Sequence, residues 1–163
     1  MSFCLILLAA GNSKRFRSSL PKPYVKIGEK TLLEYSLGKF KKIKEIKKTI
    51  VVVNKKHKKY INKINKYSFS KVIGGNSRQN STLIALKYIK KNKIKCKNVL
   101  IHDAARPNFS LELIKKIIKF SKLYNVIPKI DIQDALKEYI GNKSILNLTR
   151  NNFFLTQTPQ SVE

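Results

Sequence analysis

The sequence predicts an α/β protein with three layers, in which helices cover both faces of a mainly parallel sheet. Apolar runs alternate with helical patterns along the chain, which is the signature of βαβ units. The length of 163 residues is enough for one domain with its own core. Hydrophobic residues make up 42% of the chain and aromatic residues 9%, as expected for a folded globular protein.

The alternation defines the expected elements. We predict strands at residues 3–8, 50–53, 71–73, 98–102 and 126–130. We predict helices at residues 32–40, 56–66, 77–91 and 111–123, the third with Leu83, Ile84, Leu86 and Ile89 on one apolar stripe and the fourth capped by Ser110. Residues 134–140 and 144–148 flank Gly141-Asn142, which predicts a hairpin that is either an interface arm or a plain edge hairpin. Residues 153–157 are a candidate to return to the sheet.

The net charge of +26 suggests a polyanion as a partner. Of the 35 basic residues, however, 30 are Lys and five are Arg, and the lysines are spread over the whole chain. No DNA- or RNA-binding motif accompanies them. We therefore interpret the charge as incidental, expect no specific nucleic-acid partner, and keep a basic nucleic-acid-binding module as the remote alternative.

The two cysteines, Cys4 and Cys96, are too few for a disulfide framework. Cys4 falls within the first predicted strand, so a reduced, cytoplasmic protein is the expectation. The chain has no Cys-x-x-Cys and no His/Cys cluster, which argues against a zinc site. The apolar stretch 3–10 is too short to span a membrane and lacks a basic leader, so we expect no membrane association.

The loop after the first strand has the composition of a polyphosphate site. Its small residues let backbone N–H groups approach phosphate oxygens, and two cations, Arg15 and Lys22, follow. The spacing matches neither the Walker nor the dinucleotide pattern. Open α/β sheets bind ligands at the carboxyl ends of their strands, so we place the active site there. The alternative is a plain strand-to-loop turn in a basic protein.

Two later strands also end in polar clusters. After Gly74-Gly75, a helix cap at Ser77 explains the turn but leaves Arg78 unexplained. Asp103 ends another strand, where a carboxylate suits a Mg²⁺ ligand or an acceptor for a substrate hydroxyl. Arg106 is suited to clamp a phosphate. The alternative is a structural Asp103–Arg106 ion pair, and we expect the neighbouring His102 to be a packed strand-end residue.

Together with the tail, these residues form five motifs that resemble the 2-C-methyl-D-erythritol 4-phosphate cytidylyltransferase family. The motifs are Leu8-Ala9-Ala10-Gly11-x-x-x-Arg15, Pro21-Lys22-x-Tyr24, Gly74-Gly75-x-x-Arg78-x-x-Ser81, His102-Asp103-Ala104-Ala105-Arg106-Pro107 and Gln157-Thr158-Pro159-Gln160. They occur in the family's order and cover nearly the whole chain. The resemblance implies a Rossmann-like nucleotidyltransferase fold with a protruding β-hairpin arm.

The resemblance also implies a Mg²⁺-dependent reaction of the non-mevalonate isoprenoid pathway. The phosphate of the polyol attacks the α-phosphate of CTP, and pyrophosphate leaves. Arg15 and Lys22 would be catalytic. CTP would bind at Ala9, Ala10, Gly11, Ser13, Gly75 and Ser81, and the polyol phosphate at Asp103, Arg106, Arg150 and Thr158, with Asp103 also near the metal. The hairpin, at about residues 134–150, would be a homodimerisation arm that carries Arg150 into the partner's active site.

The chain departs from the family pattern at three places. Ser13 replaces the second glycine of the first loop, and Ala135 replaces a threonine that touches substrate, which removes one substrate hydrogen bond. Family members also continue for some tens of residues beyond the equivalent of Glu163. We therefore expect residues 1–163 to be a single domain that lacks the C-terminal part of its fold, with weak or absent activity if the protein ends there. A ribitol- or other polyol-phosphate cytidylyltransferase and an inactive truncated form remain the alternatives.

Overall fold

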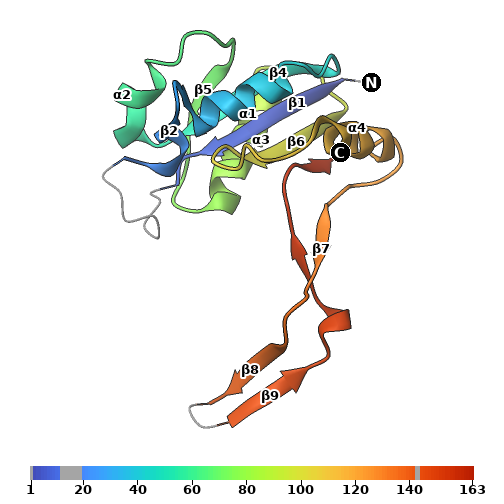
Figure 1. Cartoon of the computed structure of the whole chain (residues 1–163). Helices are drawn as coiled ribbons and strands as arrows, with labels where there is room; N and C mark the ends of the chain where they lie inside the picture. Colours follow the sequence, from blue (N-terminus) through green and yellow to red (C-terminus); the bar gives the residue numbers. More distant parts are fainter. Residues whose placement is uncertain (1, 12–19, 142–143) are drawn as a thin grey trace.

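A five-stranded sheet forms the centre of the computed structural model, which describes residues 2–11, 20–141 and 144–163 (Figure 1). The strand order is β11-β6-β1-β4-β5. Four strands are parallel, namely β1 (Phe3–Ala9), β4 (Ile46–Val53), β5 (Ser70–Ile73) and β6 (Asn98–Asp103). The fifth, β11 (Gln160–Val162), pairs antiparallel with β6 at the edge. The prediction of a mainly parallel sheet is confirmed.

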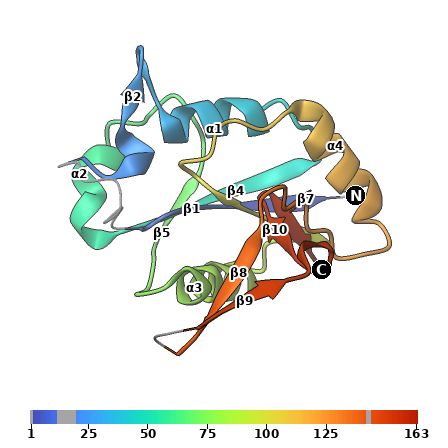
Figure 2. The same ribbon diagram turned by 60° about the horizontal axis from the view of Figure 1, so that its bottom comes forward.

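Helices cover both faces of this sheet (Figure 2). Three lie on one face, α1 (Leu32–Phe40), α2 (Lys58–Ile61) and α4 (Leu111–Phe120), and α3 (Arg78–Lys91) lies on the other. Short elements complete the described chain: the 3₁₀ turns η2 (Lys22–Tyr24), η3 (Lys55–His57) and η4 (Arg150–Asn152), and the small ladder of β2 (Lys26–Ile27) with β3 (Lys30–Thr31). The expected three-layer arrangement is confirmed.

The apolar pattern of β1 explains why this strand is central. All its residues except Leu8 are buried, because a strand covered on both faces reads as a continuous apolar run. The core is divided into two clusters by the sheet, one under α1 and α4 and one under α3. Side-chain caps fix where the helices begin: Thr31 and Glu34 form a capping box on α1, and Ser77 and Ser110 cap α3 and α4.

Two predicted elements differ from the structure. The strand expected at 126–130 is absent from the main sheet: Val126 makes one bridge to Ser161, and the chain then pairs elsewhere as β7 (Lys129–Asp131). Pro128 lacks the N–H that a continuous ladder needs, which explains the interruption. The helix expected at 56–66 is the 3₁₀ turn η3 followed by the single turn α2, which ends at Asn62, a residue type that favours helix ends over helix interiors.

The stripe predicted on the third helix is partly wrong. Leu83 is 49% exposed, and the buried positions of α3 are Ser81, Ala85 and Ile89. These three residues are four apart, so they form a single row along the helix. The small side chains of Ser81 and Ala85 let α3 lie close to the sheet near its carboxyl edge.

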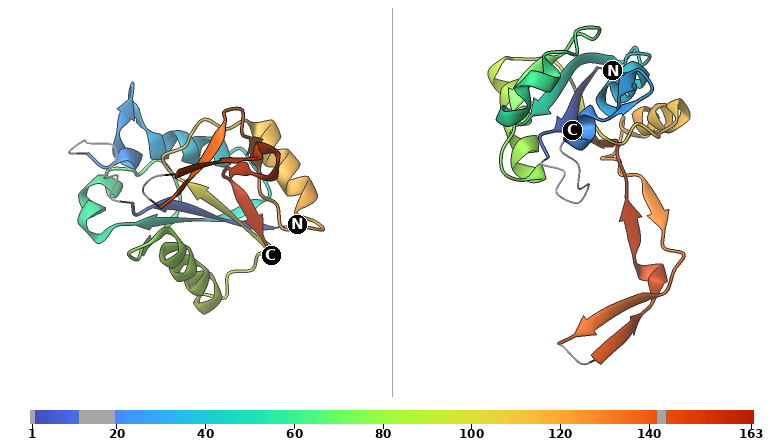
Figure 3. Two further views of the ribbon diagram at one scale, coloured as in Figure 1. Left: turned by 90° about the horizontal axis from the view of Figure 1, so that it is seen from below. Right: turned by 60° about the vertical axis from the view of Figure 1, so that its left-hand side comes forward.

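The hairpin is confirmed and belongs to a longer excursion. β8 (Leu136–Ile140) pairs with β9 (Ser144–Leu148), and a stem of β7 and β10 (Phe154–Thr156) joins the hairpin to the sheet. The segment 153–157 thus forms the stem rather than returning to the sheet. We call residues 129–156 the arm; it is wider than the predicted 134–150 and extends away from the three layers (Figures 1 and 3).

Candidate active site

The first loop and the glycine turn touch each other at the carboxyl edge of the sheet. The Gly74 N–H donates to the Val53 carbonyl (2.9 Å), which continues the β4–β5 ladder into the turn. A Cβ at Gly74 would lie 2.7 Å from the Ala10 Cβ and 2.8 Å from the Ser81 Oγ. Because no side chain fits at that position, Gly74 is what allows β1, the turn and α3 to converge.

The buried Ser81 side chain holds the backbone of the glycine turn. Its hydroxyl accepts from the Gly75 N–H (3.2 Å) and approaches the Gly75 carbonyl (3.4 Å). The side chain is only 3% exposed, so Ser81 acts on any ligand through the Gly75 peptide that it holds. A Cβ at Gly75 would lie 2.5 Å from the amide nitrogen of Asn80, so the exposed Asn80 side chain would have to move to admit one.

The first loop leaves β1 through residues whose backbone faces the same edge. Ala9 is buried in the core, while Gly11 is exposed with open space where a Cβ would be. The Asn54 side-chain amide donates to the Ala10 carbonyl (3.3 Å) and fixes the start of the loop. Ser13 and Arg15 lie outside the described residues, so their predicted roles stay predictions.

Lys22 is the first residue of η2, a turn whose other two residues are buried in the protein. Pro23 and Tyr24 are buried, and the Tyr24 ring stacks on Tyr60 with 5.3 Å between ring centroids. Burial raises the pKa of Tyr24 to about 12, so the phenol stays protonated. The anchored residues hold the backbone of η2 in place, and the Lys22 side chain is exposed.

Asp103 lies between two arginines at the end of β6. Its Oδ1 is 3.1 Å from the Arg78 Nε, and its Oδ2 is 3.2 Å from the Arg106 Nε. The Arg106 Nη1 donates to the Gln157 Oε1 (3.1 Å). We call Arg78, Asp103, Arg106 and Gln157 the Asp103 cluster. The Asp103–Arg106 ion pair is present, as the alternative reading required, but it is part of a larger arrangement that carries one surplus positive charge.

Thr158 reaches the same strand end from the tail. Its Oγ1 accepts from the Asp103 N–H at 3.5 Å, and the residue is 9% exposed. The antiparallel pairing of β11 with β6 positions this contact, because the tail must pass Asp103 before it enters the sheet. The structure therefore brings together Asp103, Arg106 and Thr158, three of the four residues predicted for the polyol phosphate.

His102 is a packed residue, as expected. It is fully buried between Phe40 and Phe109, with ring centroids at 5.2 and 4.7 Å. Burial lowers the pKa of His102 to about 4, so the ring is neutral at pH 7. Its Nε2 lies 3.0 Å from the Arg106 carbonyl; since a carbonyl only accepts, Nε2 carries the proton. His102 thereby supports the turn that presents Arg106.

Arg150 is the predicted site residue that the fold does not bring to this edge. It begins η4 on the arm, and its Nη1 donates to the Gln133 carbonyl (2.6 Å). Figure 1 shows that this turn lies between β9 and β10, beyond the stem and away from the sheet. Within one chain, Arg150 is separate from the Asp103 cluster.

The residues present do not build a protein metal site around Asp103. Both carboxylate oxygens already accept from a guanidinium group, and two neighbouring cations oppose the approach of a divalent cation. The described part of the chain contains no group of three or more His, Cys, Asp or Glu side chains that suits a metal. The predicted metal contact of Asp103 stays a prediction that this arrangement does not favour.

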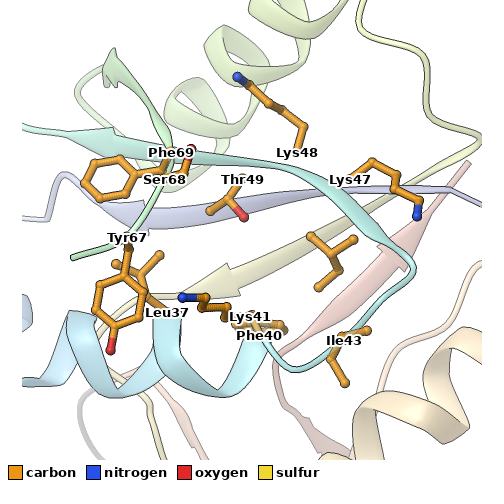
Figure 4. A pocket seen from close by; sticks show the side chains of 11 residues that line it. Leu37, Phe40, Lys41, Ile43, Lys47, Lys48, Thr49, Tyr67, Ser68 and Phe69 are labelled. Carbon is orange, nitrogen blue, oxygen red and sulfur yellow. The ribbon is translucent and has the colours of Figure 1, made fainter. Parts of the chain in front are cut away.

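A hollow in the protein surface lies away from this edge of the sheet. It has a volume of about 230 Å³ and opens between α1, the first half of β4 and the segment before β5, where Leu37, Phe40, Lys41, Thr49, Tyr67 and Phe69 line it (Figure 4). The carboxyl ends of the strands are at the opposite end of β4. This hollow is therefore distinct from the site that the sequence predicts.

The comparisons with known proteins show the family to which the chain belongs. The family model of 2-C-methyl-D-erythritol 4-phosphate cytidylyltransferase matches residues 3–163. The chain belongs to this family. It is 34% identical over 162 residues to the 2-C-methyl-D-erythritol 4-phosphate cytidylyltransferase of Thermosipho melanesiensis, with 96% of the chain and 70% of that protein covered.

Two bifunctional proteins are also similar to the chain. It is 48% identical to the bifunctional enzyme IspD/IspF of Pelagibacter ubique over 162 residues, and it covers 43% of that protein. The solved structure of the bifunctional IspDF from Campylobacter jejuni superimposes with a TM-score of 0.81 at 28% identity, over 99% of this chain and 40% of that one. The chain thus spans less than half of these two-function relatives and about 70% of the single-function one.

Three residues of the site were not assigned from the sequence. The helix cap at Ser77 does not explain Arg78, and the sequence motifs assign no role to Gln157 or Asn54. Arg78 is one of only five arginines, and Asn54 directly follows β4, much as Asp103 ends β6. Those two signals were available in the sequence, whereas the contact of Gln157 depends on the tail pairing with β6.

Among the described residues, no helix is long and apolar enough to cross a membrane.

Proposed function

We propose that the chain transfers the cytidylyl group of CTP to 2-C-methyl-D-erythritol 4-phosphate in the non-mevalonate isoprenoid pathway. The products are CDP-methylerythritol and pyrophosphate. The observation that supports this most is the position of the Asp103 cluster beside the Gly74-Gly75 turn, in a chain of the cytidylyltransferase family. One side of the edge suits a nucleotide and the other suits an anionic, hydroxyl-bearing acceptor.

The proposed reaction needs no covalent enzyme intermediate. A phosphate oxygen of the polyol forms a bond to the α-phosphorus of CTP, the bond from that phosphorus to the β-phosphate oxygen breaks, and pyrophosphate leaves with the electron pair. Catalysis then rests on orientation and on neutralising charge. We assign charge neutralisation to Lys22 and Arg15, and we propose that CTP enters as its Mg²⁺ complex, with the metal as part of the substrate.

The two substrates divide the edge between them. For CTP we propose the backbone of Ala9, Ala10, Gly11 and Ser13 on one side and Gly75, held by Ser81, on the other. For the polyol phosphate we propose Asp103 as acceptor for hydroxyl groups and Arg106 for the phosphate, with Thr158 alongside. A carboxylate that already accepts two hydrogen bonds still has lone pairs for hydroxyl donors.

We also propose that the enzyme is a homodimer joined through the arm, with Arg150 reaching the partner's site. The arm exposes large apolar side chains on both faces of its hairpin, among them Tyr139 (80%), Ile145 (57%) and Leu146 (46%). Exposed apolar area of this kind marks interaction surfaces. The two cysteines are free, in keeping with the cytoplasmic enzyme that we propose.

A panel of acceptors tests the assignment. With CTP and Mg²⁺, methylerythritol phosphate should support pyrophosphate release at least tenfold better than ribitol phosphate or glycerol phosphate. A preference for ribitol phosphate would favour the alternative enzyme of the same fold.

Lys22→Ala tests the proposed role of the cation in η2, with Lys26→Ala as the matched control. Lys26 is an exposed lysine four residues away in β2. We expect Lys22→Ala to remove most of the activity and Lys26→Ala to retain it. Equal loss in both variants would show that η2 has no special role.

A further inference from the structure

Arg78 joins the two halves of the edge. It is the first residue of α3, directly after the glycine turn, and its guanidinium crosses to the end of β6 to meet Asp103. The two residues are 25 positions apart in the sequence. Neither the turn nor the helix requires an arginine there, because Ser77 already caps the helix.

We propose that Arg78 is a positioning residue for the polyol phosphate: it fixes the Asp103 carboxylate, and through it Arg106, in the orientation that receives the acceptor. This inference rests on the proposed function. Arg78 then serves the polyol phosphate, although it directly follows the turn proposed to bind the nucleotide. Asp103 becomes an anchored hydroxyl acceptor rather than a metal ligand.

The contact contributes little to folding, which leaves orientation as its use. The Arg78 side chain is 47% exposed, that of Arg106 is 54% exposed, and that of Asp103 is 27% exposed. Exposed ion pairs stabilise proteins by about 0–1 kcal/mol. An arginine chosen for stability alone would bring no advantage over the lysines that this chain uses elsewhere.

The geometry of the contacts supports the same reading. Both arginines approach the carboxylate through Nε, at 3.1 and 3.2 Å, one on each oxygen. Gripped from both sides, the carboxylate cannot rotate without breaking a contact. Arg106 is held again through its Nη1 by Gln157, so the cluster fixes the direction of its guanidinium plane as well. A planar, oriented guanidinium is what recognition of a phosphate requires.

Calorimetric titration tests this without turnover. Methylerythritol phosphate is titrated into the chain saturated with a nonhydrolysable CTP analogue. We expect Arg78→Gln to weaken polyol-phosphate binding about tenfold and Arg78→Lys about threefold, because a lysine restores the charge but not the planar guanidinium that orients the carboxylate. Lys90→Gln is the matched control: it removes one exposed cation from the same helix, and binding should stay within twofold of the original chain.

A double variant tests whether Arg78 acts through Asp103. In the Asp103→Asn chain, adding Arg78→Gln should cost no further affinity, since residues that work as a unit are not additive. Melting temperatures of all variants should match the original. An unchanged affinity in Arg78→Gln, an equal loss of affinity for the CTP analogue, or a full additional loss in the Asp103→Asn background would each overturn the inference. An original chain that binds neither ligand would overturn the proposed function and the inference together.

Discussion

The central sheet and the arm use apolar residues in opposite ways. In β1, Ile6 is fully buried between two layers of helices, whereas in β9 the same residue type, Ile145, is 57% exposed. The apolar side chains of the sheet are buried by helices of the same chain. The arm has only two-stranded ladders, and an isolated hairpin is at best marginally stable in water. The difference supports the proposal that the arm associates with a partner, while the sheet forms the stable core beneath the candidate site.

The largest expected effect contrasts the two isoleucines directly. Ile6→Ala should lower the free energy of unfolding by about 3 kcal/mol, because it empties a packed position in the core. Ile145→Ala should change it by less than about 0.5 kcal/mol in dilute solution, where the arm is free. Urea unfolding at low protein concentration measures both. Equal losses in the two variants would break the contrast between core and arm.

The next effect is the response to pH, which we assign mainly to buried groups of the core. Both histidines of the chain lie there, and burial lowers the pKa of His102 to about 4 and also lowers that of His57. Between about pH 6.5 and pH 4 the unfolded chain binds more protons than the native one, so stability falls as the pH falls. From pH 7 to pH 5, His102 alone should cost about 2 kcal/mol.

His102→Gln isolates this contribution. The glutamine amide can still donate to the Arg106 carbonyl, but it does not titrate. The difference in unfolding free energy between pH 7 and pH 5 should shrink by most of that amount in the variant, measured by urea unfolding at both values. A variant with the full pH dependence of the original chain would rule out His102 as its source.

The smallest effect concerns association through the arm. Tyr139 and Ile145 are directly opposite each other in the β8–β9 ladder, so they form one exposed apolar pair. Ile145→Lys should raise the dissociation constant of the dimer at least tenfold, because a charge on that face must be desolvated on pairing. Sedimentation equilibrium measures it. Lys63→Gln, a charge change on the exposed surface of the three-layer part, should leave association unchanged, and equal weakening by both would count against the arm.

The same contrast explains what the sequence could predict. β1, the second half of β4 and β6 follow from apolar runs, because a strand covered on both faces leaves that pattern directly in the sequence, whereas in β5 only Val72 is buried. Contacts across the edge do not leave such a pattern: Ala10 and Ser81 both approach Gly74 so closely that a Cβ has no room there. The loss of a strand at 126–130 depends on one proline and on β11 taking the place beside β6.

The site was predictable to the extent that strand ends meet at one edge. Asp103, Arg106 and Thr158 converge as their motifs implied. Arg150 does not, because its position depends on the direction of the arm, which one chain's local patterns cannot fix. The role of Arg78 emerges only when its guanidinium is seen to share Asp103 with Arg106.

The central claim is that this edge transfers a cytidylyl group. The most direct test follows CTP labelled at the α-phosphorus, incubated with methylerythritol phosphate and Mg²⁺ and the original or Asp103→Asn chain. The label should appear in a polyol-linked product, with one unlabelled pyrophosphate released for each, and the rate should fall at least a hundredfold in the variant. A folded original chain that produces no labelled product, or a variant as fast as the original, would contradict the account.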